Sequence, residues 1–109
     1  MNGIKYDNGK PDYTLLPLDA LEQVVEVLTF GASKYDRHNW KKVDNLHQRY
    51  SAAAMRHIVA YMKNEDIDEE SGYSHLAHAI CCLMFMLQED ADNIKQDYNK
   101  AKPIFGVVT

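Results

Sequence analysis

Two histidines three residues apart are the first feature of this 109-residue sequence that suggests chemistry. His75 and His78 lie in a segment whose pattern predicts a helix, and residues at i and i+3 share one helix face. Their imidazoles can therefore reach a common ligand or metal ion, with a nearby carboxylate completing the site. The alternative is a pair of core histidines that are hydrogen-bonded to their neighbours. A third imidazole, His57 in another predicted helix, favours the functional interpretation.

Carboxylates that could hold a metal ion occur in two places. Glu22 and Glu26 are four residues apart in a predicted helix, and such a pair can supply oxygen ligands to Mg²⁺. The alternative for this pair is a solvated acidic helix face. The second place is the acidic stretch of residues 64–72, which includes Asp68 and Glu70 and directly precedes the histidine pair. Much of the acidity behind the net charge of −4 therefore lies where a metal site would need it.

A nucleotide-binding site would also need cations and flat rings, and the sequence contains both. Phosphate groups are bound by several positive donors that approach from different directions. The candidate cations are Lys5, Lys10, Lys34, Arg37 and Arg56. Tyr35, Asn39 and Trp40 follow the first predicted helix, and rings can stack on a base while an amide can read a base edge. The alternative is that the cations are solvated surface groups and that Trp40 caps the core.

Three predicted helices must position these groups. Apolar residues recur with helical spacing over residues 18–35, 46–63 and 73–92. The segments outside them include an irregular N-terminal arm over residues 1–17 and a tail over residues 98–109. The sequence shows neither an alternating strand series nor a βαβ pattern, so we predict a single all-α domain that comprises all 109 residues.

The third predicted helix indicates self-association. Residues 77–87 are apolar nearly all round apart from His78, and a helix of this kind needs cover on every side. Three helices from one chain cannot easily provide that cover. We therefore expect a small helical bundle that is completed by homo-oligomerisation.

Composition excludes several classes of protein. A chain that is 46% hydrophobic and 26% charged is typical of a globular domain, and the net charge of −4 argues against binding to duplex nucleic acid. The longest apolar stretch is too short to cross a membrane, and no signal peptide is visible. The adjacent Cys81 and Cys82 are expected to be buried, reduced thiols, which favours a cytoplasmic protein.

Four segments taken together resemble a known family. They are KYDNGKPDYTLLP at residues 5–17, VLTFGASKYDRHNW at 27–40, RYSAAAMRHIVAYM at 49–62 and DIDEESGYSHLAHAICCLMFML at 66–87. In this order they resemble the small phage-type family described as dATP/dGTP diphosphohydrolase (N-terminal domain), a relative of the MazG-like all-α nucleotide pyrophosphohydrolases. The resemblance extends over most of the chain.

The resemblance implies a helical oligomer, located in the host cytoplasm if phage-encoded, with a nucleoside triphosphate site that depends on Mg²⁺ or Mn²⁺. The implied reaction is attack of water at the α–β phosphate linkage of a purine deoxynucleotide, which gives a monophosphate and pyrophosphate. The implied metal ligands are Glu22, Glu26, Asp68 and Glu70, and the implied catalytic residues are Glu70, His75 and His78. The implied substrate-binding residues are Lys5, Lys10, Lys34, Tyr35, Asn39, Trp40, Arg56 and His57.

The sequence departs from the MazG-like pattern: it offers Glu22-x-x-x-Glu26 on its first predicted helix, and it differs most on the third. MazG-like enzymes carry an E-E-x-x-E motif on one helix and E-x-x-D on another, whereas this chain has His75-x-x-His78 where the second motif is expected. Imidazole is a poor ligand for Mg²⁺ and a better one for Mn²⁺, Co²⁺ or Zn²⁺. Two functions therefore remain open. One is the metal-dependent pyrophosphohydrolase, and the other is a non-catalytic phage sponge that sequesters a cyclic or adenine-derived immune signal as an anti-defence protein.

Overall fold

Helices make up the regular structure of the computed structural model, which describes residues 2–98. The three α-helices are α1 (Leu18–Lys34), α2 (Leu46–Met62) and α3 (His75–Tyr98), and the two short 3-10 helices are η1 (Tyr13–Leu15) and η2 (Asn39–Lys42). The described residues contain no named strand, and their one β feature is an isolated bridge between Ile67 and Ser74. The prediction of an all-α fold is therefore confirmed.

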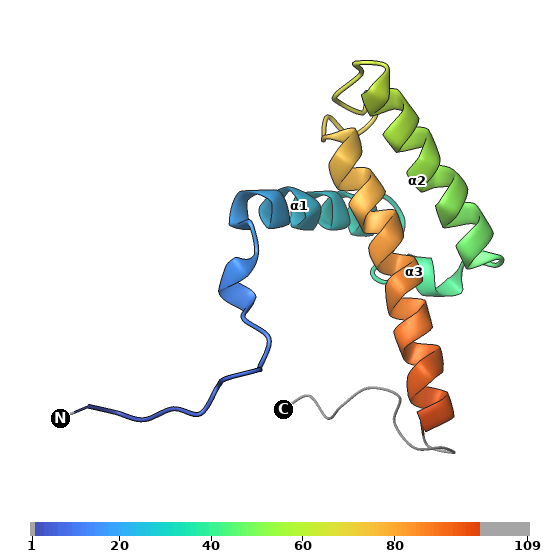
Figure 1. The fold of residues 1–109 in the computed structure, drawn as a ribbon. Helices are drawn as coiled ribbons and strands as arrows, with labels where there is room; N and C mark the ends of the chain where they lie inside the picture. Colours follow the sequence, from blue (N-terminus) through green and yellow to red (C-terminus); the bar gives the residue numbers. More distant parts are fainter. Residues whose placement is uncertain (1, 99–109) are drawn as a thin grey trace.

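The third helix is the centre of the arrangement. In Figure 1, α2 and α3 form an antiparallel hairpin, and α1 crosses α3. The N-terminal arm, drawn in dark blue, extends away from the helices (Figure 1). Among the described residues, no helix is both long enough and apolar enough to cross a membrane.

The core between α1 and α3 is built from small side chains. Val24, Val27, Ala77 and Cys81 form its buried cluster, and each is at most 5% exposed. The Cys81 thiol lies 3.5 Å from the carbonyl oxygen of Val24, to which it donates a hydrogen bond. Small residues at the contact let the two helix backbones approach closely, and the larger Phe85 packs at the edge of the cluster. The crossing therefore buries only a narrow stripe of each helix.

The predicted helix boundaries need small corrections. The third helix begins at His75 and not at residue 73, because the preceding residues close a loop through the bridge at Ser74. The helix also continues to Tyr98, six residues beyond the prediction. The first helix ends at Lys34, where the backbone N–H of Tyr35 caps it by donating to the carbonyl of Gly31. Residues 99–109 of the predicted tail lie outside the described residues.

The two cysteines provide a test of this core. Both are free and buried as expected, and burial raises the pKa of Cys81 to about 12 and also raises the pKa of Cys82. Because the thiolate is the reactive form, we expect neither thiol to be labelled by a disulfide reagent in the folded protein at about pH 8. Both should react once guanidinium chloride unfolds the chain. Rapid labelling of the native protein would contradict this packing.

Candidate functional site

The loop between α2 and α3 holds Asp68 in a fixed position. The backbone N–H of Asp68 donates to the carbonyl of Tyr73, and the N–H of Gly72 donates to the carbonyl of Asp68, both at 2.8 Å. The carboxylate Oδ2 of Asp68 accepts a hydrogen bond from the backbone N–H of Ser71 at 2.9 Å. Gly72 has a φ of +78°, which a residue with a side chain rarely adopts, so this closed loop depends on glycine.

Three imidazoles meet beside this loop. Nδ1 of His57 on α2 lies 2.8 Å from Nδ1 of His75, the first residue of α3. The rings of His57 and His78 are stacked, with centroids 4.6 Å apart and an angle of 13° between their planes. Nε2 of His78 lies 2.7 Å from Oγ of Ser71 and 3.7 Å from Oδ2 of Asp68. The i, i+3 spacing of the histidines on α3 thus brings both of them to His57.

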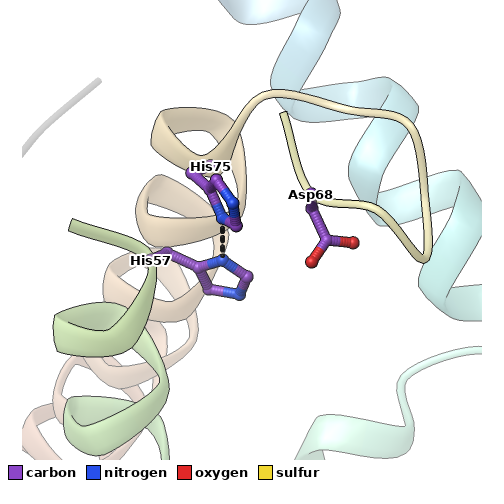
Figure 2. A group of neighbouring side chains, drawn as sticks. All are labelled: His57, Asp68 and His75. Atoms are coloured by element: carbon purple, nitrogen blue, oxygen red, sulfur yellow. Dashed lines mark hydrogen bonds between the residues drawn. The ribbon is translucent and has the colours of Figure 1, made fainter. Parts of the chain in front are cut away.

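One histidine–carboxylate group in this region brings together side chains of the types that can hold a metal ion. His57, Asp68 and His75 each have a possible ligand atom, and these three atoms all lie within 4.8 Å of one another. Figure 2 shows that the side chains come from α2, from the loop and from the start of α3. His75 is 9% exposed, whereas His57 and Asp68 are half-buried.

A cavity of about 790 Å³ opens next to this group. Its volume falls within the usual range for small-molecule sites, which is roughly 300–1,000 Å³. The predicted site residues that line it are Lys34, Tyr35, Asn39, Trp40, Arg56, His57, Asp68, Glu70 and His78, and Arg37 joins them. Residues from α1, α2, α3 and both intervening loops therefore converge on one space.

The remaining predicted residues lie elsewhere. Glu22 and Glu26 are exposed on α1 and belong neither to the cavity lining nor to the histidine–carboxylate group. Lys5 and Lys10 are exposed in the N-terminal arm, and they too lie outside the cavity lining. His75 does not line the cavity but contacts His57, which does.

The aromatic residues form one wall of the cavity. The Trp40 ring stacks on Phe85, with centroids 5.1 Å apart and an angle of 12° between the planes. The Tyr50 ring packs edge-on against the Phe85 ring, and the two centroids are 5.1 Å apart. Nζ of Lys34 lies 5.0 Å from the centre of the Tyr35 ring. Trp40 thus contacts a residue at the edge of the core and also lines the cavity, so the two interpretations of this residue are compatible.

The structure adds residues that the sequence analysis did not select. Ser71 contacts both Asp68 and His78, and its position three residues after an aspartate is a local pattern that could have been recognised. Phe85 stacks on Trp40 and Tyr50 packs against Phe85, but both lie in apolar helical patterns, which gave no reason to separate them from ordinary core residues.

The site favours the neutral forms of His57 and His78 next to an ionised Asp68. Burial lowers the pKa of His57, with further lowering by the other two histidines, and burial also lowers the pKa of His78 although Asp68 opposes this. Burial by itself would raise the pKa of Asp68, but the hydrogen bonds from Ser71 and the nearby histidines outweigh it and lower that pKa. Neutral imidazole and ionised carboxylate are the forms that bind metal ions.

These features define a small all-helical domain with a cavity that is lined by cations and aromatic rings beside a histidine–carboxylate group. The chain belongs to the family described as dATP/dGTP diphosphohydrolase, N-terminal, whose sequence model matches residues 1–99. It is 40% identical over 86 residues to a protein of Salmonella phage PMBT28 named dATP/dGTP diphosphohydrolase. That match covers 79% of this chain and 29% of the relative, so the chain spans less than a third of the relative's length. No solved structure matches the chain. The family resemblance seen in the sequence is thereby confirmed.

The lowered histidine pKa values predict how stability depends on pH. Because the pKa of His57 and His78 is lower in the folded chain than the ordinary value of 6.5, the unfolded chain binds more protons just below that pH. The free energy of unfolding of the metal-free protein should therefore fall as the pH decreases from about 7 to about 5. The lowered pKa of Asp68 acts in the same direction, but only below its ordinary value of 3.8.

Urea unfolding followed by circular dichroism across this pH range, in the presence of a chelator, measures the effect. His78→Gln should reduce the slope, because it removes one of the two groups that the folded state holds unprotonated. A stability that stays constant over the same range would contradict the assignment.

Proposed function

We propose that this chain binds a purine deoxynucleoside triphosphate and hydrolyses it to the monophosphate and pyrophosphate. The observation that carries the proposal is that cationic side chains, aromatic rings and two members of the histidine–carboxylate group, His57 and Asp68, line one cavity. Membership of the diphosphohydrolase family and the name of the phage relative support it. The chain spans only 29% of that relative, so the activity is proposed for this chain on the basis of its own cavity.

The cations of the cavity are suited to a triphosphate. Lys34, Arg37 and Arg56 line it from the end of α1, the following loop and α2, so they approach from different sides. Arginine can contact a phosphate with two parallel N–H groups, whereas lysine acts as a point charge. Lys34 forms an ion pair with Glu70, and hydrogen bonding to Glu70 and Tyr35 raises its pKa. The lysine is therefore charged at neutral pH and can exchange its carboxylate partner for a phosphate oxygen.

The aromatic wall is suited to a purine base. Trp40 is held in place by its stacking on Phe85 and lines the same cavity as Tyr35 and Asn39. A base that stacks on such a ring gains about 1–3 kcal/mol, and the amide of Asn39 can hydrogen-bond to a base edge. Base and triphosphate would then lie across the cavity from the aromatic wall to the histidines.

The chemistry requires an activated water and an acceptor for its proton. A divalent cation, Mg²⁺ or Mn²⁺, would neutralise phosphate charge and lower the pKa of the water. His78 is the candidate proton acceptor, since burial lowers its pKa and so favours the neutral form, and its Nε2 lies 2.7 Å from Ser71 Oγ and 3.7 Å from the Asp68 carboxylate. The water oxygen bonds to the α-phosphorus, the α–β bridging bond breaks, and pyrophosphate leaves. Asp68, 3.7 Å from Nε2, would stabilise the imidazolium that forms.

The arrangement of the carboxylates supports a second candidate function, which is a sponge that binds a nucleotide without hydrolysing it. Glu22 and Glu26 lie outside the cavity lining, and Glu70 is paired with Lys34. Asp68 alone of these predicted metal ligands belongs to the histidine–carboxylate group. A cavity with few carboxylates is compatible with tight binding of a cyclic or adenine-derived nucleotide without its hydrolysis.

A direct assay separates the two functions. The purified chain is incubated with dATP, dGTP, dCTP and a cyclic dinucleotide, each with Mg²⁺ or Mn²⁺, and the products are separated by anion-exchange chromatography. We expect deoxynucleoside monophosphate and pyrophosphate from dATP and dGTP, and His78→Gln should lower kcat at least tenfold, because general-base catalysis typically contributes about 10²–10⁴-fold. Lys63→Ala, at the C-cap of α2 outside this cavity, is the matched control. Absence of turnover together with release of an intact nucleotide on heating would overturn the hydrolase proposal in favour of the sponge.

Substitutions at the two ends of the cavity test the placement of the nucleotide. Arg56→Ala and Trp40→Ala should each weaken binding by about 1–3 kcal/mol, because one removes a charged phosphate donor and the other a stacking platform. Calorimetry with a non-hydrolysable dATP analogue measures this loss. Trp40→Phe should retain more affinity than Trp40→Ala, and Lys63→Ala should bind normally. Unchanged affinity in both alanine variants would place the nucleotide outside this cavity.

We also infer that the chain forms a homo-oligomer through α3. Leu76, Ile80, Leu83 and Leu87 are 41%, 41%, 50% and 70% exposed. Their spacing of four, three and four residues places them in one stripe along the helix, which is the pattern of helices that pack together. An exposed apolar stripe of this kind favours a second helix against it, and a second copy of this chain carries the same stripe.

Light scattering coupled to size-exclusion chromatography tests the oligomer. We expect a mass of at least twice the 12.5 kDa of one chain, and Leu83→Glu combined with Leu87→Glu should reduce it to that of a monomer. Asn93→Glu, which adds a carboxylate to an exposed position farther along α3, is the control and should leave the mass unchanged. A monomeric wild-type protein would contradict the inference.

A further inference from the structure

We propose that His57, Asp68 and His75 form a metal centre that takes a transition-metal ion such as Mn²⁺, Co²⁺ or Zn²⁺ in preference to Mg²⁺. The part that this ion plays in hydrolysis rests on the proposed function, whereas its binding does not. The assignment moves the metal site away from Glu22 and Glu26 and replaces carboxylates with imidazoles as the principal ligands.

The first argument is the convergence of ligand atoms from three separate elements. α2, the α2–α3 loop and the first residue of α3 each contribute one group, and all three atoms lie within 4.8 Å of one another (Figure 2). Ligand atoms about 2.0–2.2 Å from a tetrahedral ion are roughly 3.4 Å apart. An ion between His57 and His75 therefore requires their nitrogens, now 2.8 Å apart, to separate slightly while the Asp68 carboxylate moves inwards. Changes of this size lie within the reach of side-chain rotation.

The second argument is the chemistry of the donor set. Two imidazoles and one carboxylate suit transition-metal ions of borderline softness, whereas Mg²⁺ prefers an octahedral shell of oxygen atoms. Three protein ligands also leave at least one position open for water or a phosphate oxygen, which is the arrangement of catalytic zinc sites. Glu70 is absent from the set, because its side chain is 59% exposed and is paired with Lys34.

The third argument is the support around the ligands. Ser71 donates its backbone N–H to the Asp68 carboxylate, and its hydroxyl contacts Nε2 of His78. The ring of His78 in turn stacks on that of His57, which limits rotation of this ligand. Partners that orient the ligands are a regular feature of metal sites. Because His57 and Asp68 line the cavity and His75 lies behind them, the open position would face the nucleotide.

Metal titration of the full chain tests the centre. The protein is prepared without a histidine tag, stripped with a chelator and titrated by calorimetry with MnCl₂, ZnCl₂ and MgCl₂ separately. We expect one Mn²⁺ or Zn²⁺ per chain, bound at least tenfold more tightly than Mg²⁺. Titration with Co²⁺ should produce visible absorption bands typical of a site with nitrogen ligands. Equal affinity for Mg²⁺ and Mn²⁺, or no binding of the transition ions, would overturn the proposal.

Near-isosteric variants identify the ligands. His57→Gln and Asp68→Asn should each weaken Mn²⁺ binding at least tenfold, since even loss of an orienting partner commonly costs 10–100-fold. His47→Gln and Glu69→Gln are matched controls, because His47 lies on the same helix and pairs with Asp90, while Glu69 is exposed in the same loop. Affinity that is unchanged in both ligand variants, or lost in both controls, would overturn the assignment.

Paramagnetic broadening of NMR signals in the wild-type protein is a second test of the ligands, and it does not depend on how the variants fold. Substoichiometric Mn²⁺ should broaden the ring proton signals of His57, His75 and His78 before those of His38 and His47. Broadening that begins at His38 or His47 would overturn the assignment.

The outcomes also separate this centre from the proposed function. If Mn²⁺ binds and depends on His57 but no nucleotide is hydrolysed with any ion, the hydrolase proposal fails and the metal centre stands. If dATP and dGTP are hydrolysed with Mg²⁺ and His57→Gln changes neither ion binding nor turnover, the metal centre fails and the hydrolase proposal stands.

Discussion

The contact between His57 and His75 is the interaction on which the rest of the site depends. It joins the last third of α2 to the first residue of α3, and it is made where the loop between these helices closes through hydrogen bonds of Asp68 and Gly72. A loop that closed differently would change the start of α3 and would turn His75 and His78 away from α2. The antiparallel hairpin and the histidine group are therefore one structural unit.

The first helix adds the other half of the site to this unit. Its crossing with α3 relies on small residues such as Ala77 and Cys81, which leave room for the helix and bring its C-terminal end to the histidines. Lys34 and the loop that carries Trp40 thereby reach the cavity, and Trp40 is held there by Phe85. The same narrow crossing leaves much of α3 uncovered. The packing of α1 on α3 therefore forms the cavity and also leaves the apolar stripe from Leu76 to Leu87 exposed.

Electrostatics and burial act together at the histidines. Removal from water and mutual repulsion keep His57 and His78 neutral, while hydrogen bonds keep Asp68 ionised. Neutral imidazoles and an ionised carboxylate are the forms that can bind a metal ion, and the cationic side chains of Lys34, Arg37 and Arg56 line the cavity beside this group. The N-terminal lysines Lys5 and Lys10 and the carboxylates of Glu22 and Glu26 have no place in this arrangement as the single chain shows it.

The sequence by itself determined the helices, the family and the residue types of the site, because helical periodicity and local motifs are properties of neighbouring residues. It identified His75 and His78 as partners since they are only three residues apart. Only the tertiary structure decided that His57 and Asp68 join them, and that Glu22 and Glu26 do not, because these distances depend on how the α2–α3 loop closes and on which stripe of α1 is buried. Loop closure and helix crossing arise from packing between distant segments, which the spacing of residues along the chain does not record.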